Sequence, residues 1–134
     1  MNINELVDNF SLFEDWEDRY AYLIDLGGRL PSMEEALKTD ETKVQGCMSQ
    51  VWMVLSRDEN KRLHIVADSD AQIVKGLIAV LKVIYDGHTA EEAAEVDVEA
   101  VFSKLGLHQH LSVNRRNGFF AMVEKIQVFI GLGT

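Results

Sequence analysis

The chain has 134 residues, of which 47% are hydrophobic and 26% are charged, and its formal net charge at pH 7 is −9. The length predicts a single domain over residues 1–134, and the composition excludes a disordered or fibrous protein. The acidic balance argues against nucleic acid and anionic membranes as partners, because both bind clustered Lys and Arg.

No apolar run approaches the roughly 20 residues that a membrane-spanning helix requires, and the N-terminus has no basic and apolar secretory signal. A single cysteine excludes an internal disulfide, which is typical of a protein from a reducing compartment. We therefore expect a cytoplasmic protein without a membrane partner.

Apolar residues spaced three and four apart predict two helices at the start of the chain. A short amphipathic helix covers about residues 2–10. The next helix places Trp16 and Tyr20 on its apolar face, where core packing is the expected role of both rings. The pair Gly27-Gly28 is predicted to end this helix in a left-handed conformation.

Two segments in the middle of the chain have the composition of strands. Residues 51–55 and 63–67 are rich in β-forming side chains, and the segment between them is polar, so they predict an antiparallel hairpin. A two-stranded hairpin is only marginally stable alone, so it must pack on helices. The segment around residues 43–45 is expected to add a third strand.

The second half of the chain is predicted to be helical because it carries residues that begin helices. In a capping box, a Ser or Thr and a Glu or Gln three positions later satisfy each other's backbone N–H groups. The residues that fit a box or a single cap are Ser69 with Gln72, Thr89 with Glu92, Asp97, and Ser112. Several helices packed against one small antiparallel sheet define an α+β fold class.

Cys47 is the only cysteine, and it lies between an irregular segment and the first predicted strand. Loops on a rigid scaffold often display reactive groups, but a lone cysteine is also common as a small buried hydrophobe. A thiol is nucleophilic as the thiolate, whose unperturbed pKa is about 8.5, so a cation such as the nearby Lys43 would help it. The residues alone leave open whether Cys47 is a working thiol.

Several other chemistries lack the residues that they need. A redox dithiol requires a second cysteine, and a structural zinc site normally takes four Cys or His ligands at paired spacing, whereas His108 and His110 form the only close pair. The chain has no Gly-rich phosphate loop. We therefore predict no metal and no cofactor. A hydrolytic Cys–His pair would require that one of the four histidines meets Cys47 in space.

Four blocks of sequence match the signature of one protein family, in order, along nearly the whole chain. They are residues 16–20 with 26–31, residues 46–52, residues 68–77, and residues 105–112 followed by Arg115 and Gly118. The second block has the pattern G-C-x-S-x-V-W, and the third has the pattern D-S-D-A-x-I-V-K-G-L. These blocks resemble the SufE family, the sulfur acceptors of cysteine desulfurases.

The resemblance implies an α+β fold similar to the IscU-like iron–sulfur scaffold proteins, with the acceptor cysteine on a loop above an apolar cavity. It implies that Cys47 takes persulfide sulfur from a PLP-dependent cysteine desulfurase, of the SufS or CsdA kind, and stimulates that enzyme. The sulfur then goes to a downstream iron–sulfur scaffold complex. Pyridoxal phosphate would belong to the partner, so the chain would be a sulfur-transfer partner rather than a stand-alone enzyme.

Three further residues are expected to support Cys47. Arg115 matches a family position near the acceptor loop and is expected to stabilise the thiolate or bind the desulfurase, and Lys43 lies close in sequence. Asp70 is expected to support the site as well. Its other expected role is at the start of a helix, where a carboxylate complements the helix dipole. His110 is expected to be structural.

Two other functions remain open at this point. One is a stand-alone thiol-dependent hydrolase or transferase that uses Cys47 with a histidine. The other is a binding module that regulates a partner without carrying sulfur.

Overall fold

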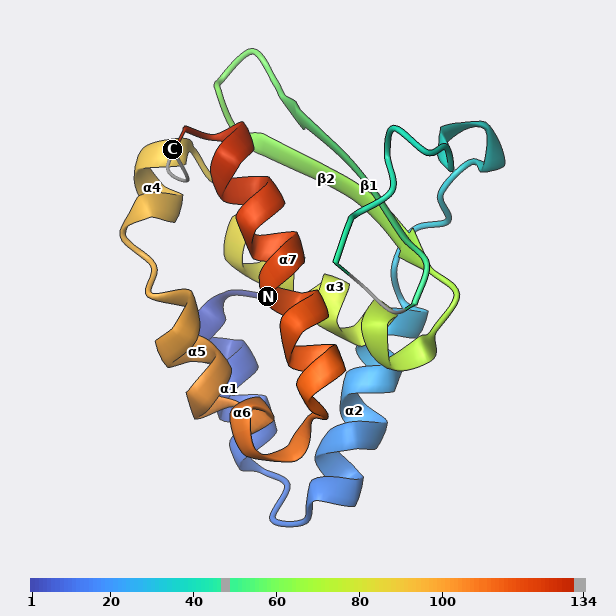
Figure 1. Cartoon of the computed structure of the whole chain (residues 1–134). Coiled ribbons are helices and arrows are strands. Elements are labelled where there is room, and N and C mark those ends of the chain that lie inside the picture. The colour runs from blue at the N-terminus through green and yellow to red at the C-terminus, as the bar shows by residue number, and fades with distance from the viewer. Residues whose placement is uncertain (47–48, 132–134) are drawn as a thin grey trace.

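A two-stranded antiparallel sheet lies beside a group of helices in the computed structural model, which describes residues 1–46 and 49–131 (Figure 1). The described residues confirm the predicted α+β class. The elements are α1 (Ile3–Ser11), α2 (Trp16–Gly28), the 3₁₀ turn η1 (Glu35–Leu37), β1 (Val51–Arg57), β2 (Leu63–Ser69), α3 (Gln72–Tyr85), α4 (Ala90–Ala94), α5 (Val98–Lys104), α6 (Leu107–His110) and α7 (Val113–Phe129).

Helix α3 is the centre of the core. Ten of its residues are buried, and it lies behind α7 in Figure 1, with the sheet to one side of the pair. The inner face of α7 contributes Phe119, Val123 and Ile126, as the helical spacing predicts. Within the described part of the chain, no helix has both the length and the apolar character needed to span a membrane.

The predicted hairpin is confirmed, and the predicted third strand is reduced to one bridge. Strands β1 and β2 pair in antiparallel register, with Trp52 opposite Asp68. Lys43 forms an isolated bridge to Trp52, flanked by hydrogen bonds from Val44 N–H to the carbonyl of Val51 and from Met53 N–H to the carbonyl of Thr42, both 2.8 Å long. The bridge stays short because residues 39–42 form a turn and Gly46 has a positive φ of 89°.

The prediction that Gly27 and Gly28 end α2 in a left-handed conformation is wrong. Both are the last residues of the helix, and neither is among the described glycines with positive φ. Gly27 is explained by a close helix contact instead: a Cβ atom built on it would lie 2.5 Å from the backbone nitrogen of Gly76 in α3. The absence of a side chain therefore lets α2 and α3 approach each other.

Three of the four predicted helix starts are confirmed. The Thr89–Glu92 capping box is present, Asp97 accepts a hydrogen bond from Ala100 N–H, and Ser112 accepts one from Arg115 N–H.

The fourth predicted start, a capping box formed by Ser69 and Gln72, is wrong. Ser69 is the last residue of β2, and Ala71 is the N-cap of α3 without a side-chain hydrogen bond. The Ser69 hydroxyl donates to the carbonyl of Gln50 at 2.7 Å and accepts from Ala71 N–H at 3.2 Å, so it bonds to these two backbone groups instead of forming the box with Gln72.

Candidate functional site

Cys47, the predicted site residue, lies outside the described residues, and its neighbours Gly46 and Ser49 are described. Gly46 packs against α7: a Cβ atom built on it would lie 3.4 Å from the Cβ of Ala121. Its φ of 89° is also one that other residues rarely adopt. Gly46 is therefore required by backbone conformation directly before the cysteine.

The chain after Cys47 is fixed to the end of β2 through Gln50. The Gln50 N–H donates to Oδ1 of Asp70 at 3.1 Å, and the Gln50 carbonyl accepts from the Ser69 hydroxyl at 2.7 Å and from Asp70 N–H at 3.2 Å. Asp70 therefore binds the backbone after Cys47, and its carboxylate makes no cap for α3. Its position directly before Ala71, the N-cap of α3, is compatible with the helix-start role as well.

The chain before Cys47 is fixed to β1 and α7. The Val44 side chain is buried, and its N–H bonds to Val51 at the start of β1. Lys125 of α7 donates from Nζ to the carbonyl of Thr42 at 3.4 Å. Lys43 lines a groove beside α7 together with Lys125. Lys43, which the sequence predicts to support the thiol, therefore lies between β1 and α7 in the segment that leads to Cys47.

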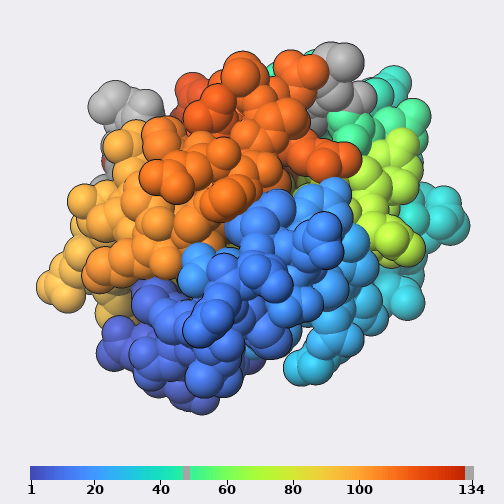
Figure 2. Space-filling model, turned by 90° about the horizontal axis from the view of Figure 1, so that it is seen from below, coloured from blue at the N-terminus to red at the C-terminus, as the bar shows by residue number. Residues whose placement is uncertain are grey.

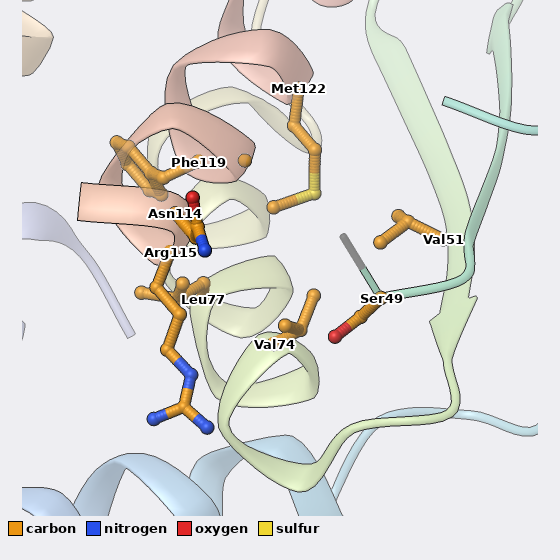
Figure 3. Close-up of a pocket in the computed structure, with 9 residues that line it drawn as sticks. Ser49, Val51, Val74, Leu77, Asn114, Arg115, Phe119 and Met122 are labelled. Carbon is orange, nitrogen blue, oxygen red and sulfur yellow. The ribbon is translucent and has the colours of Figure 1, made fainter. Parts of the chain in front are cut away.

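A small apolar cavity of about 30 Å³ opens next to Ser49 (Figure 3). Its apolar wall comes from three elements: Val51 in β1, Val74 and Leu77 in α3, and Phe119 and Met122 in α7. The polar groups that line it include Ser49, Asn114 and Arg115. A cavity of this volume has room for a water molecule or an atom of similar size.

Arg115 lines the same cavity, but its guanidinium is directed toward α2 (Figure 3). Its Nη1 donates to the hydroxyl of Tyr20 at 3.0 Å. Close by, His110 stacks on Trp16 with ring centroids 4.5 Å apart, which places it in a structural contact as expected. Figure 2 shows the face where the N-terminal helices, in blue, meet the orange residues of the C-terminal third. Arg115 thus connects the cavity to α2.

Sequence reasoning missed an ion pair next to this site. Lys38 Nζ lies 2.9 Å from Oδ2 of Asp68, and Lys75 Nζ lies 3.5 Å from the other oxygen. Burial opposes ionisation of Asp68, but hydrogen bonds from Lys38 and Ser69 N–H, with the charges of both lysines, bring its pKa below the usual 3.8. The hydrogen bonds to Asp68 and Glu35 raise the pKa of Lys38 above 10.5. No sequence signal links Lys38 to Asp68, because only the fold brings them together.

The histidines of the chain lie away from the cavity. No histidine is among the described residues that line it, and His64 instead contacts Asp58 at 3.0 Å near the hairpin turn. That hydrogen bond is the main reason why the pKa of Asp58 is lowered. No group of three or more potential metal ligands is found among the described side chains. Among the described side chains, no histidine lines the cavity and no cluster has the ligands of a metal centre.

Comparison with known proteins identifies the family. The family model described as "SufE: Fe-S metabolism associated domain" matches residues 4–130. A SufE-like protein of Rhizobium meliloti (strain 1021) is 42% identical over 129 residues, covering 94% of this chain and 92% of its own length. A SufE-like protein of Rhizobium etli is 43% identical over 129 residues, covering 94% and 87%. The chain belongs to the SufE family, which is associated with iron–sulfur metabolism.

The fold is also found among solved structures. The solution structure of a hypothetical protein from Thermus thermophilus aligns with a TM-score of 0.77 at 16% identity. The alignment covers 98% of this chain and 94% of that one. At this level of identity, the likeness shows a shared fold.

Proposed function

We propose that this member of the SufE family is a sulfur acceptor whose residues 1–134 act as one domain. Cys47 takes sulfur from the persulfide of a PLP-dependent cysteine desulfurase, stimulates that enzyme and passes the sulfur to an iron–sulfur scaffold complex. The observation that carries the proposal is the Gly46–Trp52 signature around the single cysteine, in a chain that matches the family model over residues 4–130.

The transfer step conserves electrons. The Cys47 thiolate attacks the outer sulfur of the desulfurase persulfide, forms a new S–S bond to it, and breaks the S–S bond within the partner. The desulfurase cysteine leaves as a thiolate, so one sulfur atom moves and no external oxidant or reductant is consumed. The pyridoxal phosphate that forms the persulfide belongs to the desulfurase. This chain then has no need for a cofactor of its own.

The cavity beside Ser49 supports the carrier role. A persulfide is lost to other thiols by exchange, so a carrier benefits from shielding the outer sulfur. An apolar cavity of about 30 Å³ lined by Val51, Leu77 and Met122 has room for an atom as small as sulfur. A location in the cytoplasm, where thiols stay reduced, fits a single free cysteine.

Three charged residues near the site have proposed supporting roles. Arg115 lines the cavity and bonds to Tyr20, and its proposed role is to stabilise the Cys47 thiolate or to bind the desulfurase. Lys43 adds positive charge before Cys47, and positive charge favours a thiolate. Asp70 sets the position of the backbone after Cys47 through Gln50. All three act on the conformation or charge around one thiol.

Mass spectrometry after incubation with a cysteine desulfurase and free cysteine tests the proposal. We expect Cys47 to gain one sulfur atom, about 32 Da, and desulfurase turnover to rise. Cys47→Ser should abolish both effects while the fold is retained, because serine replaces only the sulfur atom. An unlabelled wild-type protein beside an active desulfurase would refute the carrier role. Stimulation that survives in Cys47→Ser would point to a regulatory binding module instead.

A further inference from the structure

A cluster of charged side chains lies on the outer face of the sheet, the face opposite to the buried one. Asp68 of β2 pairs with Trp52 of β1, and both side chains point to this face. Lys38 Nζ lies 2.9 Å from Asp68 Oδ2 and 5.3 Å from the centroid of the Trp52 ring. The side chains of Lys38 and Asp68 are only 16% and 19% exposed. The contact is thus more enclosed than an ordinary surface ion pair.

Lys38 stands at the start of residues 38–46, which we call the lead-in segment because they lead to Cys47. The segment turns directly after Lys38, where the hydroxyl of Thr42 donates to the carbonyl of Leu37 at 2.6 Å. It then pairs with β1 through the Met53 N–H to Thr42 carbonyl bond and the Val44 N–H to Val51 carbonyl bond. The ion pair to Asp68 therefore holds the first residue of the lead-in segment on the sheet.

The three consecutive residues Asp68, Ser69 and Asp70 hold both sides of Cys47. Asp68 binds Lys38 before the cysteine, while Ser69 and Asp70 bind the backbone of Gln50 after it. One short piece of chain at the end of β2 thus contacts both the first residue of the lead-in segment and Gln50 after the cysteine.

We propose that Lys38 and Asp68 are positioning residues for sulfur acceptance. This inference rests on the proposed function. The ion pair keeps the lead-in segment on β1, so that a docking desulfurase meets a segment that is already ordered. Without the pair, the segment opens more often, and docking has to order it again at an entropic cost. The loss falls on the apparent affinity for the desulfurase, because Cys47 and the cavity are unchanged.

Lys38→Met tests the inference, because methionine keeps most of the aliphatic stem and removes the charge. Lys75→Met is the matched control: it removes an equal charge from the same carboxylate, but Lys75 lies on α3 and not on the lead-in segment. Lys38→Arg keeps the ion pair and should rescue.

The first measurement is hydrogen exchange of the backbone amides of Val44 and Met53, which bond across the bridge. We expect Lys38→Met to speed their exchange about threefold to tenfold and Lys75→Met to leave it within about twofold. Equal acceleration in both variants, or none in Lys38→Met, would overturn the inference. This measurement needs no desulfurase, so it is independent of the proposed function.

The second measurement is desulfurase stimulation as a function of acceptor concentration. We expect the half-saturating concentration of Lys38→Met to rise about threefold to tenfold, with the maximal rate unchanged. Lys38→Arg should restore the wild-type value. A lower maximal rate at unchanged half-saturation would overturn the positioning role, whereas a wild-type protein that never takes up sulfur would overturn the proposed function itself.

Discussion

The contact between α2 and α3 makes opposite predictions for two adjacent glycines. A Cβ atom on Gly27 would lie 2.5 Å from the backbone nitrogen of Gly76 and 2.7 Å from the carbonyl carbon of Lys75. These are backbone atoms, so relief requires the two helices to move apart. A Cβ atom on Gly28 would meet nothing within 4 Å. Gly27→Ala and Gly28→Ala thus add the same atom to the same helix in two different environments.

The magnitudes follow from two opposing effects. Alanine is favoured over glycine inside a helix by up to about 1 kcal/mol, and this gain is shared by both variants. Overpacking at a tight contact costs about 1–3 kcal/mol and applies to Gly27 alone. We therefore expect Gly28→Ala to be neutral or slightly stabilising. Gly27→Ala should be less stable than Gly28→Ala by about 1–3 kcal/mol.

Urea denaturation followed by the fluorescence of Trp16 and Trp52 measures this difference. The transition midpoint should fall in Gly27→Ala at an unchanged slope, and the thermal midpoint should lie roughly 4 °C lower for each kcal/mol. If Gly27→Ala were as stable as Gly28→Ala, the close approach of the two helices would be refuted. The position of α3, which contributes Val74 and Leu77 to the cavity wall, would then be wrong as well.

Three further predictions concern single side chains. Thr89→Ala should lower the free energy of unfolding by about 1 kcal/mol in the same urea assay, because it removes the cap that accepts from Glu92 N–H. Met122→Ala should cost about 2–5 kcal/mol, since Met122 is fully buried beside the cavity, and a wild-type midpoint would contradict that placement. Burial raises the pKa of Tyr85 above 10.0 despite a hydrogen bond from Gln127, so the unfolded chain releases this proton first. Stability should therefore fall as pH rises above about 10, and Tyr85→Phe should flatten that slope.

Local sequence patterns predicted the features that depend on local contacts. The caps at Thr89, Asp97 and Ser112 formed as expected because each side chain bonds to a backbone N–H within three residues. The sequence pattern gives the wrong role for Gly27, because a glycine near a helix end is typical of a left-handed stop. In the structure, the missing side chain of Gly27 instead allows close contact with a residue of another helix. The sequence predicts a third strand where the structure has a single bridge, because periodicity does not show where the segment turns away from β1.

The candidate site divides in the same way. The signature around Cys47 identifies a thiol and the family to which the chain belongs. The contacts that surround the thiol join residues far apart in the chain, such as Arg115 with Tyr20, which are 95 positions apart. Lys38 and Asp68 also meet only in the fold. Their pairing is a property of tertiary structure that neither spacing nor composition records.

Ser69 and Thr89 show why the same pattern has two uses. Each is followed three positions later by a residue that can complete a capping box, Gln72 or Glu92. Thr89 closes its box, but the hydroxyl of Ser69 donates to the carbonyl of Gln50 on the neighbouring chain segment. Ser69 is buried, and a buried hydroxyl without a partner costs more than an open helix start, whose N–H groups water can satisfy. The D-S-D block, residues 68–70, is therefore better understood as a set of residues that bind the chain on both sides of Cys47 than as a helix start.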